Sequence, residues 1–261
     1  SSVPTEAKYG RDHIVENICK AIDNYRSRTD CAVIGVGSAG DIDDSCGKVT
    51  YATAALPGFT GLDLRGALKA RFGGKIVVVN DASAALIGEV YVGGSKGERP
   101  MMLTLGTGLG CAMIKDREKL GCGSVDNIRL GHYVLHEGGR DCRCGKKGCA
   151  EMYVSATGLK MNADKDKVED ILYNAEYAFA VDKFCSDFKK VLEYACLTYD
   201  PDEILIGGGV VEMAEQWWDK LCNMCSSDVS NRLKKAELGN SAALLGSAYA
   251  ALNGAFGMQM S

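Results

Sequence analysis

Apolar helices alternate with buried strands along the first hundred residues. Apolar positions repeat at helical spacing between residues 12 and 26, and continuous apolar runs at residues 31–36 and 76–79 are typical of strands buried in a parallel sheet. Residues 64–72 and 82–90 suit helices, the second begun by Asn80 and Asp81 as capping residues. Helices and buried strands in this order predict an α/β fold.

A different pattern begins near Met101. Two apolar strands, at residues 101–105 and 111–114, flank a glycine-rich connection short enough for a β-hairpin. Further on, residues 178–197 predict a long amphipathic helix, residues 203–206 a strand and residues 241–252 a final helix. We therefore expect two α/β domains, residues 1–103 and 104–244, with a C-terminal helix at about 245–261 returning to the first domain.

Composition narrows the class of protein. With 261 residues, 46% of them hydrophobic, the chain is long enough for two packed domains. It has twelve cysteines but no recognisable signal peptide and no apolar run of the ~20 residues that a membrane helix needs. We expect a cytoplasmic protein with no membrane partner. A net charge of −4 without a basic run argues against nucleic-acid binding.

A tight cluster of potential metal ligands lies in the middle of the chain. Two glycines, Gly145 and Gly148, would let the loop turn sharply enough for three cysteine sulfurs and a histidine to meet one tetrahedral ion. The pattern predicts a structural zinc site, and the alternative is a set of free cysteines in a surface loop. The four predicted ligands are His132, Cys142, Cys144 and Cys149.

Glycine-rich turns and one aspartate are further candidates for chemistry. The turn around Gly106 and Gly108 exposes backbone N–H groups that suit an anion, although a hairpin also needs glycine for its conformation alone. Asp81 follows a buried strand and opens a helix, so it lies at the edge of the sheet where α/β proteins bind ligands. A simple helix cap is the alternative for Asp81.

The cysteine cluster resembles the signature of the ROK family of sugar kinases and repressors, a Gly-His followed by C-x-C-G-x-x-G-C-x-E. The match is residue for residue across the cysteines. The resemblance implies two ribonuclease H-like domains of the actin-like ATPase superfamily around a cleft. It also implies ATP-dependent phosphorylation of a glucose-like hexose or an N-acetylhexosamine, with structural zinc and with magnesium bound to ATP. We expect a homodimer.

The resemblance also assigns roles to single residues. It implies that Asp81 is the general base that takes a proton from the sugar hydroxyl. The expected hexose-binding residues are Asn80, His132, Glu151 and Gly40. The expected ATP and phosphate-binding residues are Gly106, Thr107, Gly108 and Gly110 in one turn, and Gly207, Gly208 and Gly209 in another.

Two departures from the family pattern leave other functions open. Arg129 stands where family kinases carry a sugar-binding glutamate, so it would bind an anionic group or turn outward. The family's first phosphate loop, D-x-G-G-T-K, would lie before the first residue, and we expect the natural protein to have further N-terminal residues. The alternatives are the sugar-sensing domain of a ROK repressor and a catalytically inactive relative.

Overall fold

The computed structural model describes residues 3–27, 33–115, 117 and 125–253 of the chain. Its largest sheet has five strands in the order β7-β6-β5-β8-β9. Strands β5 and β6 form the predicted antiparallel hairpin, whereas β8 pairs in parallel with both β5 and β9. The strand bounds are Pro100–Leu105 for β5, Leu109–Ile114 for β6, Val125–Asn127 for β7, Glu203–Gly207 for β8 and Leu233–Lys235 for β9.

Two smaller sheets lie in the N-terminal part. Strand β1 (Val33–Ser38) pairs in parallel with β4 (Lys75–Asn80), and β2 (Asp41–Asp43) forms an antiparallel hairpin with β3 (Lys48–Tyr51). Helices α1 (Arg11–Arg26) and α2 (Leu64–Phe72) cover this region. The helix predicted at 64–72 is confirmed, and β1 continues two residues beyond the predicted end at Val36.

The long helix predicted at residues 178–197 is confirmed as α6. The amphipathic stripe expected between residues 178 and 197 is fully buried in α6. The bounds are α3 Asp81–Tyr91, α4 Ala156–Ala163, α5 Val168–Leu172, α6 Ala178–Tyr199, α7 Trp218–Met224, α8 Ser227–Ser230 and α9 Ala242–Asn253. Short 3₁₀ helices are η1 Ala7–Tyr9, η2 Leu130–His132, η3 Ala150–Met152, η4 Ala175–Tyr177, η5 Gly209–Gln216 and η6 Gly239–Ser241.

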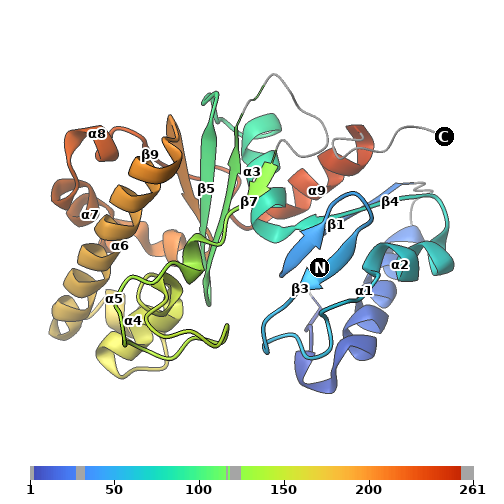
Figure 1. Ribbon diagram of the computed structural model, residues 1–261, viewed down its shortest axis with the longest axis horizontal. Helices are drawn as coiled ribbons and strands as arrows, with labels where there is room; N and C mark the ends of the chain where they lie inside the picture. Colours follow the sequence, from blue (N-terminus) through green and yellow to red (C-terminus); the bar gives the residue numbers. More distant parts are fainter. Residues whose placement is uncertain (1–2, 28–32, 116, 118–124, 254–261) are drawn as a thin grey trace.

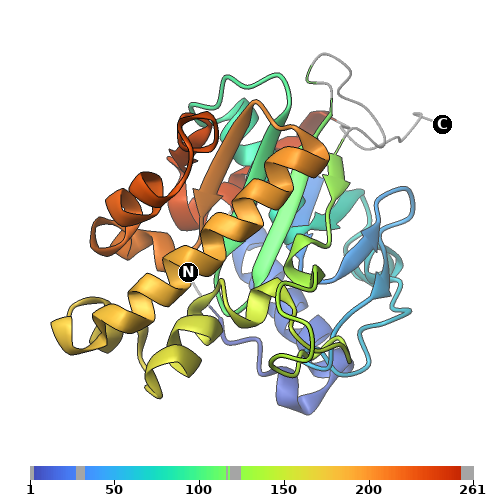
Figure 2. The same ribbon diagram turned by 60° about the vertical axis from the view of Figure 1, so that its left-hand side comes forward.

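Alternating side chains on the strands build a layered molecule. On β5, Met101 and Leu103 pack with α6 on one face, which α6 crosses diagonally (Figure 2), while Met102 packs with α3 and α9 on the other. On β4, Val77 and Val79 also face α3 and α9. The pair α3 and α9 is therefore a shared middle layer between the five-stranded sheet and the β1–β4 sheet (Figure 1).

We call the described residues up to Asn80 the N-terminal lobe and Pro100–Lys235 the C-terminal lobe. The predicted α/β class is confirmed. The division at residues 103 and 104 stays a prediction, and β5 belongs as a whole to the larger sheet. Of the predicted C-terminal helix, residues 254–261 lie outside the described part, as do residues 31 and 32 of the first predicted strand. Within the described ranges, no helix is long and apolar enough to span a membrane.

Helices α3 and α9 touch through their backbones. A Cβ on Gly246 would lie 1.8 Å from the carbonyl oxygen of Ala84, and a Cβ on Gly88 would lie 2.2 Å from that of Ala242. On the sheet side, a Cβ on Gly35 of β1 would lie 2.1 Å from the carbonyl oxygen of Ser247. Only glycine fits at these crossings, so the small-residue sequence of α9 is required by its packing.

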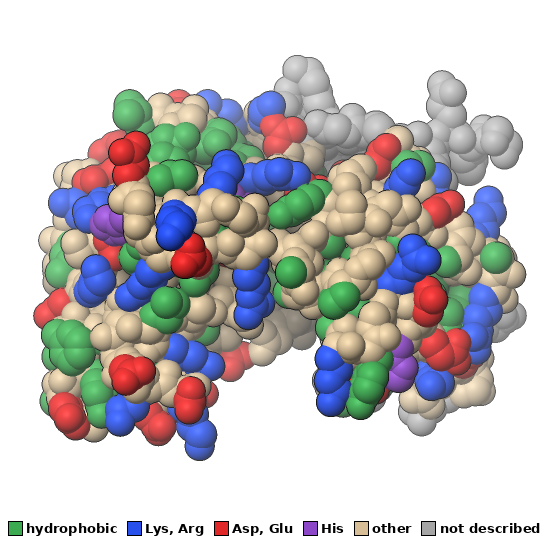
Figure 3. Space-filling view, turned by 60° about the horizontal axis from the view of Figure 1, so that its bottom comes forward, with side chains coloured by type: hydrophobic (Ala, Val, Ile, Leu, Met, Phe, Trp, Pro, Cys, Tyr) green, Lys and Arg blue, Asp and Glu red, His purple; other side chains and the backbone are tan. Residues whose placement is uncertain are grey.

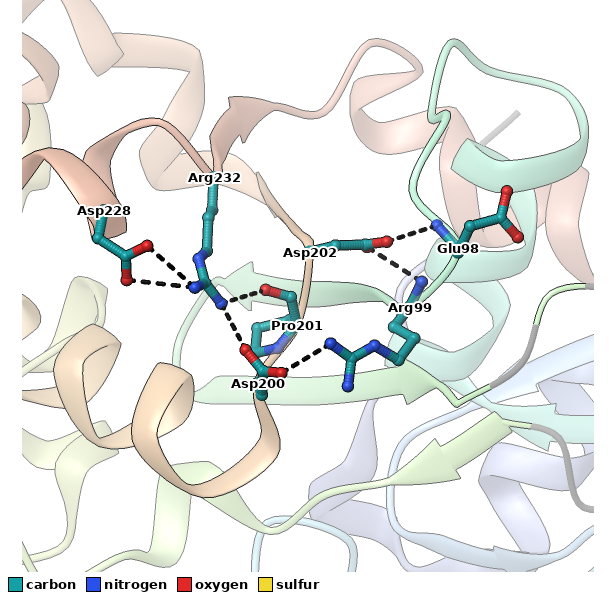
Figure 4. Close-up of polar contacts among 7 residues, drawn as sticks. All are labelled: Glu98, Arg99, Asp200, Pro201, Asp202, Asp228 and Arg232. Atoms are coloured by element: carbon teal, nitrogen blue, oxygen red, sulfur yellow. Dashed lines mark hydrogen bonds and ion pairs between the residues drawn. The ribbon is translucent and has the colours of Figure 1, made fainter.

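Ion pairs hold together the amino ends of the central strands (Figure 4). Asp200, just before β8, accepts bonds from Arg99 at 2.7 Å and from Arg232 at 2.9 Å. Asp202 accepts the backbone N–H groups of Glu98 and Arg99 at 2.8 and 3.0 Å. These contacts are largely exposed and add little stability individually, but they connect the starts of β5 and β8.

Substituting Gly246→Val tests the contact between α3 and α9. The valine side chain has no space against Ala84, so we expect the free energy of unfolding to fall by about 1–3 kcal/mol or more. Leu244→Val is the matched control, because Leu244 lies on the same helix and is 70% exposed. Its effect should stay within about 0.5 kcal/mol. Equal losses in urea unfolding of the two variants would contradict the packing argument.

Candidate functional site

The turn between β5 and β6 lies at the carboxyl end of β5. None of its glycines adopts a positive φ, so the alternative that they serve only the turn conformation is not supported. Gly106 faces open space, since no atom lies within 4 Å of where its Cβ would be. Helix α4 fixes the turn: Ala156 N–H donates to the Gly106 carbonyl at 2.9 Å and the Thr157 hydroxyl to that of Thr107 at 2.6 Å. The result is an immobilised turn whose outer surface is free for a ligand.

Two of these glycines permit close approach by other elements. A Cβ on Gly108 would lie 2.6 Å from Oε2 of Glu151, and a Cβ on Gly110 would lie 2.3 Å from Oγ1 of Thr104 and 3.2 Å from the Cβ of Ala82. The turn therefore lies directly against the start of α3 on one side and against Glu151 on the other. The predicted base, phosphate and sugar residues thus gather around one turn.

Asp81 is the first residue of α3, directly after β4. Asn80 caps this helix with its side-chain oxygen, which accepts from the N–H groups of Ala82 and Ser83. The Asn80 amide donates to Oδ1 of Asp81 at 3.0 Å and to the Gly40 carbonyl at 2.9 Å. Asn80, not Asp81, is therefore the N-cap, which leaves the Asp81 carboxylate available for chemistry.

The surroundings of Asp81 change its acidity. Its side chain remains accessible to solvent, but the protein packed around it partly excludes water, and this desolvation raises the pKa of the carboxyl. Hydrogen bonds from the backbone of Ala82 and from Asn80 oppose that rise in pKa without cancelling it. A carboxyl with a raised pKa is a better proton acceptor than an ordinary aspartate.

The predicted zinc ligands converge on one point. Their four ligand atoms all lie within 4.8 Å of one another. The Cys142 sulfur is 3.7 Å from Nδ1 of His132, and the sulfurs of Cys144 and Cys149 are 3.6 Å apart. A tetrahedron with zinc–sulfur bonds of about 2.3 Å has edges of about 3.8 Å, so these spacings fit the ion. Gly145 and Gly148 have φ of +88° and +75°, as their predicted turn roles require.

The chemistry of the donors also fits a dication. Burial raises the pKa of the Cys142 and Cys149 thiols, so their ionisation needs a compensating positive charge. A zinc ion held by three cysteines and His132 Nδ1 would supply that charge and would cross-link the loop. A set of unrelated free cysteines would not bring four donors together in this way.

Glu151 connects the metal cluster to the glycine turn. Its Oε1 lies 2.9 Å from the sulfur of Cys142 and 3.5 Å from Nδ1 of His132, and its other oxygen approaches Gly108. With Nδ1 turned to the cluster, Nε2 of His132 is the ring nitrogen left for another partner. His132 and Glu151 therefore lie together, as predicted.

The second glycine turn meets the first at the same sheet edge. Gly207 ends β8, where it is in register with Thr104 of β5. Gly208 has a φ of +94°, and a Cβ there would lie 2.6 Å from the Leu105 carbonyl oxygen. Gly209 faces open space. The carboxyl ends of β5 and β8 thus present two adjacent glycine turns, the usual location of ligands in such sheets.

One functional candidate escaped the sequence analysis. Glu89 is fully buried on α3, and its oxygens accept the N–H groups of Glu237 and Leu238 at 3.0 and 2.8 Å. It fixes the backbone before Gly239, beside the second glycine turn. The signal was present, because a glutamate within the apolar run 82–90 must find partners when it is buried.

Arg129 binds an anionic group of the protein itself, while its side chain stays 56% exposed. It lies just before η2 in the C-terminal lobe and forms an ion pair with Asp41 of the N-terminal lobe. Its guanidinium also lies over the ring of Tyr51, 4.8 Å from the centroid. Arg129, Tyr51 and His132 line a cavity of about 300 Å³. The space-filling view shows the molecule hollowed between the two lobes (Figure 3).

Comparisons with known proteins agree with this geometry. A family model described as the ROK family matches residues 1–254. A glucokinase of Halalkalibacterium halodurans is 30% identical over 239 residues, covering 80% of this chain and 72% of the relative. An N-acetyl-D-glucosamine kinase of Vibrio parahaemolyticus is 26% identical over 221 residues, covering 76% of this chain and 72% of the relative.

A solved structure shares the fold, which is that of ROK sugar kinases. The ROK family glucokinase from Streptomyces griseus, crystallised with glucose and AMPPNP, superposes with a TM-score of 0.79 at 24% identity. The superposition covers 93% of this chain and 88% of the other.

Elemental analysis of protein prepared without chelator should find one zinc per chain. Cys144→Ala should lose the metal and stability with it, because removing one ligand of a closed site forfeits much of a contribution that is coupled to folding. Cys222→Ala, which alters a half-buried cysteine of α7 away from the cluster, is the control and should retain zinc. Absence of metal from the unaltered protein would contradict the assignment.

Proposed function

Because this chain belongs to the ROK family, we propose that it transfers the γ-phosphate of ATP to a hydroxyl of a hexose, either a glucose-like sugar or an N-acetylhexosamine. The observation that carries this proposal is the meeting of three groups at the β5–β6 turn. Ala82, the residue after Asp81, lies beside Gly110, Glu151 lies beside Gly108, and Gly106 faces open space that a phosphate could occupy.

In the proposed reaction Asp81 is the general base. Its carboxylate would accept a hydrogen bond from the attacking hexose hydroxyl, orient that hydroxyl and take its proton as the phosphoryl group is transferred. Two features support this role. Asn80 holds the Asp81 carboxylate by a bond of 3.0 Å and performs the capping itself, and the raised pKa favours proton acceptance.

The hexose would lie between the lobes. Nε2 of His132 and a carboxylate oxygen of Glu151 are suited to sugar hydroxyls, since one can donate or accept and the other accepts. Asn80 and Gly40 would shape the opposite wall, although the Asn80 side chain already has its own protein partners. Zinc bound by His132, Cys142, Cys144 and Cys149 would supply rigidity to the loop that presents these groups.

ATP would bind along the carboxyl edge of the larger sheet. The backbone around Gly106, Thr107, Gly108 and Gly110 would hold phosphate oxygens by N–H groups, and the turn at Gly207, Gly208 and Gly209 would contact the nucleoside. Magnesium bound with ATP would supply the charge that neutralises the phosphates. The expected homodimer and cytoplasmic location stay predictions.

The direct test is ADP release by the purified protein, with a panel of neutral hexoses and N-acetylhexosamines. For a hexose kinase, the rate of ADP release should rise when its sugar is added, and the product should be a sugar phosphate detectable by mass spectrometry. Hexose binding without ADP release would instead support a sugar-sensing domain or an inactive relative.

Asp81→Asn should abolish phosphoryl transfer and leave hexose affinity within about an order of magnitude. The amide keeps the shape and one hydrogen bond but cannot accept the proton. Asp126→Asn is the matched control, because Asp126 is a partly exposed aspartate of β7 that pairs with Lys115. Turnover should be unchanged in the control. Near-normal turnover of the Asp81 variant would rule out this base.

The acid side of the pH profile provides a second measurement. A general base works only when ionised, so kcat/KM should fall as the pH drops through the pKa of Asp81. Because desolvation raises that pKa, the fall should begin at a higher pH than for an ordinary aspartate. A profile that stays flat throughout the acid range in which the protein remains folded would contradict the role of Asp81.

A further inference from the structure

The ion pair between Arg129 and Asp41 crosses from one lobe to the other. Arg129 comes from the C-terminal lobe, while Asp41 begins β2 in the N-terminal lobe. Asp41 is in register with Tyr51 of β3, whose ring lies under the same guanidinium. Two neighbouring side chains of one hairpin therefore hold Arg129, which fixes both the arginine and the carboxylate it contacts.

Asp41 is connected to the proposed base by a short chain of contacts. The Asn80 amide bridges the carboxylate of Asp81, at 3.0 Å, and the carbonyl oxygen of Gly40, at 2.9 Å. Asp41 is the next residue after Gly40. Its ion-pair partner Arg129 and its strand partner Tyr51 line the same cavity as His132. Asp41 therefore adjoins a proposed hexose-binding residue of the N-terminal lobe, Gly40, and contacts an arginine that lines the cavity with His132.

Only part of the Asp41 carboxylate is occupied. Arg129 contacts Oδ2, and Oδ1 has no hydrogen-bond partner among the described residues. The side chain is 26% exposed, so Oδ1 is neither sealed in the protein nor fully surrounded by solvent. A carboxylate oxygen held in this way is a strong acceptor for a hydroxyl, because hydrogen bonds to ionised groups are about twice as strong as neutral ones.

We propose that Asp41 is a substrate-binding residue that accepts a hydroxyl of the hexose, and that Arg129 is the positioning residue that orients it. This inference rests on the proposed hexose kinase function. Arg129 replaces a glutamate of the family pattern, and the structure places an alternative carboxylate, from the other lobe, at the tip of that arginine. The carboxylate that the family pattern places at position 129 is thus supplied by Asp41 of the other lobe, and an acceptor for the sugar remains.

The pairing of Arg129 with Asp41 has a consequence for substrate specificity. Because Asp41 already neutralises Arg129, the pair does not offer a free cation to a substrate. A sugar carrying a carboxylate or phosphate at this position would face Asp41 and would be repelled. The site should therefore select a neutral hexose with a hydroxyl directed towards the N-terminal lobe.

Calorimetry with neutral hexoses tests the role of Asp41. Asp41→Asn should weaken binding of the preferred hexose by about ten- to a hundredfold, the range for one charge-assisted hydrogen bond. Asp126→Asn, which alters a partly exposed, ion-paired aspartate of the C-terminal lobe, is the control and should bind the hexose unchanged. Thermal unfolding and zinc content of each variant establish that it is folded.

Deoxyhexoses identify the bond itself. In the unaltered protein, one single-hydroxyl deletion among the 2-, 3-, 4- and 6-deoxy sugars should weaken binding by a similar factor. In Asp41→Asn the same deletion should cost little, whereas the other deletions should cost as much as before. If Asp41 had a purely structural role, its substitution would not change the cost of removing one hydroxyl while leaving the cost of removing the others unchanged.

Arg129 is tested through its dependence on Asp41. Arg129→Leu should weaken hexose binding, Arg129→Lys should restore part of it, and Arg129→Leu combined with Asp41→Asn should bind no more weakly than Asp41→Asn alone. If the unaltered protein binds a hexose but Asp41→Asn keeps its affinity and its deoxyhexose pattern, the ion pair only fastens the lobes. That result overturns this inference and leaves the kinase proposal standing. If the unaltered protein binds no hexose and releases no ADP, the kinase proposal fails and this inference fails with it.

Discussion

The backbone contact between α3 and α9, at Gly88 and Gly246, holds the two sheets at the separation on which the rest of the molecule depends. These two helices form the only described layer that packs against both the five-stranded sheet and the β1–β4 sheet. Any side chain larger than glycine at the crossing would push the helices apart. The separation of these two helices therefore follows from two residues that have no chemistry of their own.

Helix α3 carries this constraint into the site. Its first residue is Asp81, and Glu89, two turns later, fixes the backbone of Glu237 and Leu238 beside the second glycine turn. One rigid element thus sets the position of the proposed base and supports the segment proposed to contact the nucleoside. A shift of α3 would displace both together, which preserves their relative position as phosphoryl transfer requires.

The features that could be predicted from the sequence are those determined by residues close together in the chain. The metal cluster was recognisable because its ligands and glycines are close in the sequence, and α6 was recognisable by its long apolar stripe. Strands β2, β7 and β9 were not predicted, because three residues are too few for a periodic pattern. The glycines of the β5–β6 turn were ambiguous for another reason: Gly108 is required by Glu151, which lies far along the chain.

Arg129 shows why a residue cannot be interpreted from its own position alone. As a single substitution, it reverses a charge and removes a sugar acceptor. In the folded molecule a carboxylate is supplied instead by Asp41, a residue 88 positions earlier that only tertiary structure brings to the arginine. An arginine is suited to this pairing, because its charge persists at all accessible pH values and its planar head also packs on Tyr51. A site of this kind depends on which charges face each other across the cleft, and either lobe can supply the carboxylate.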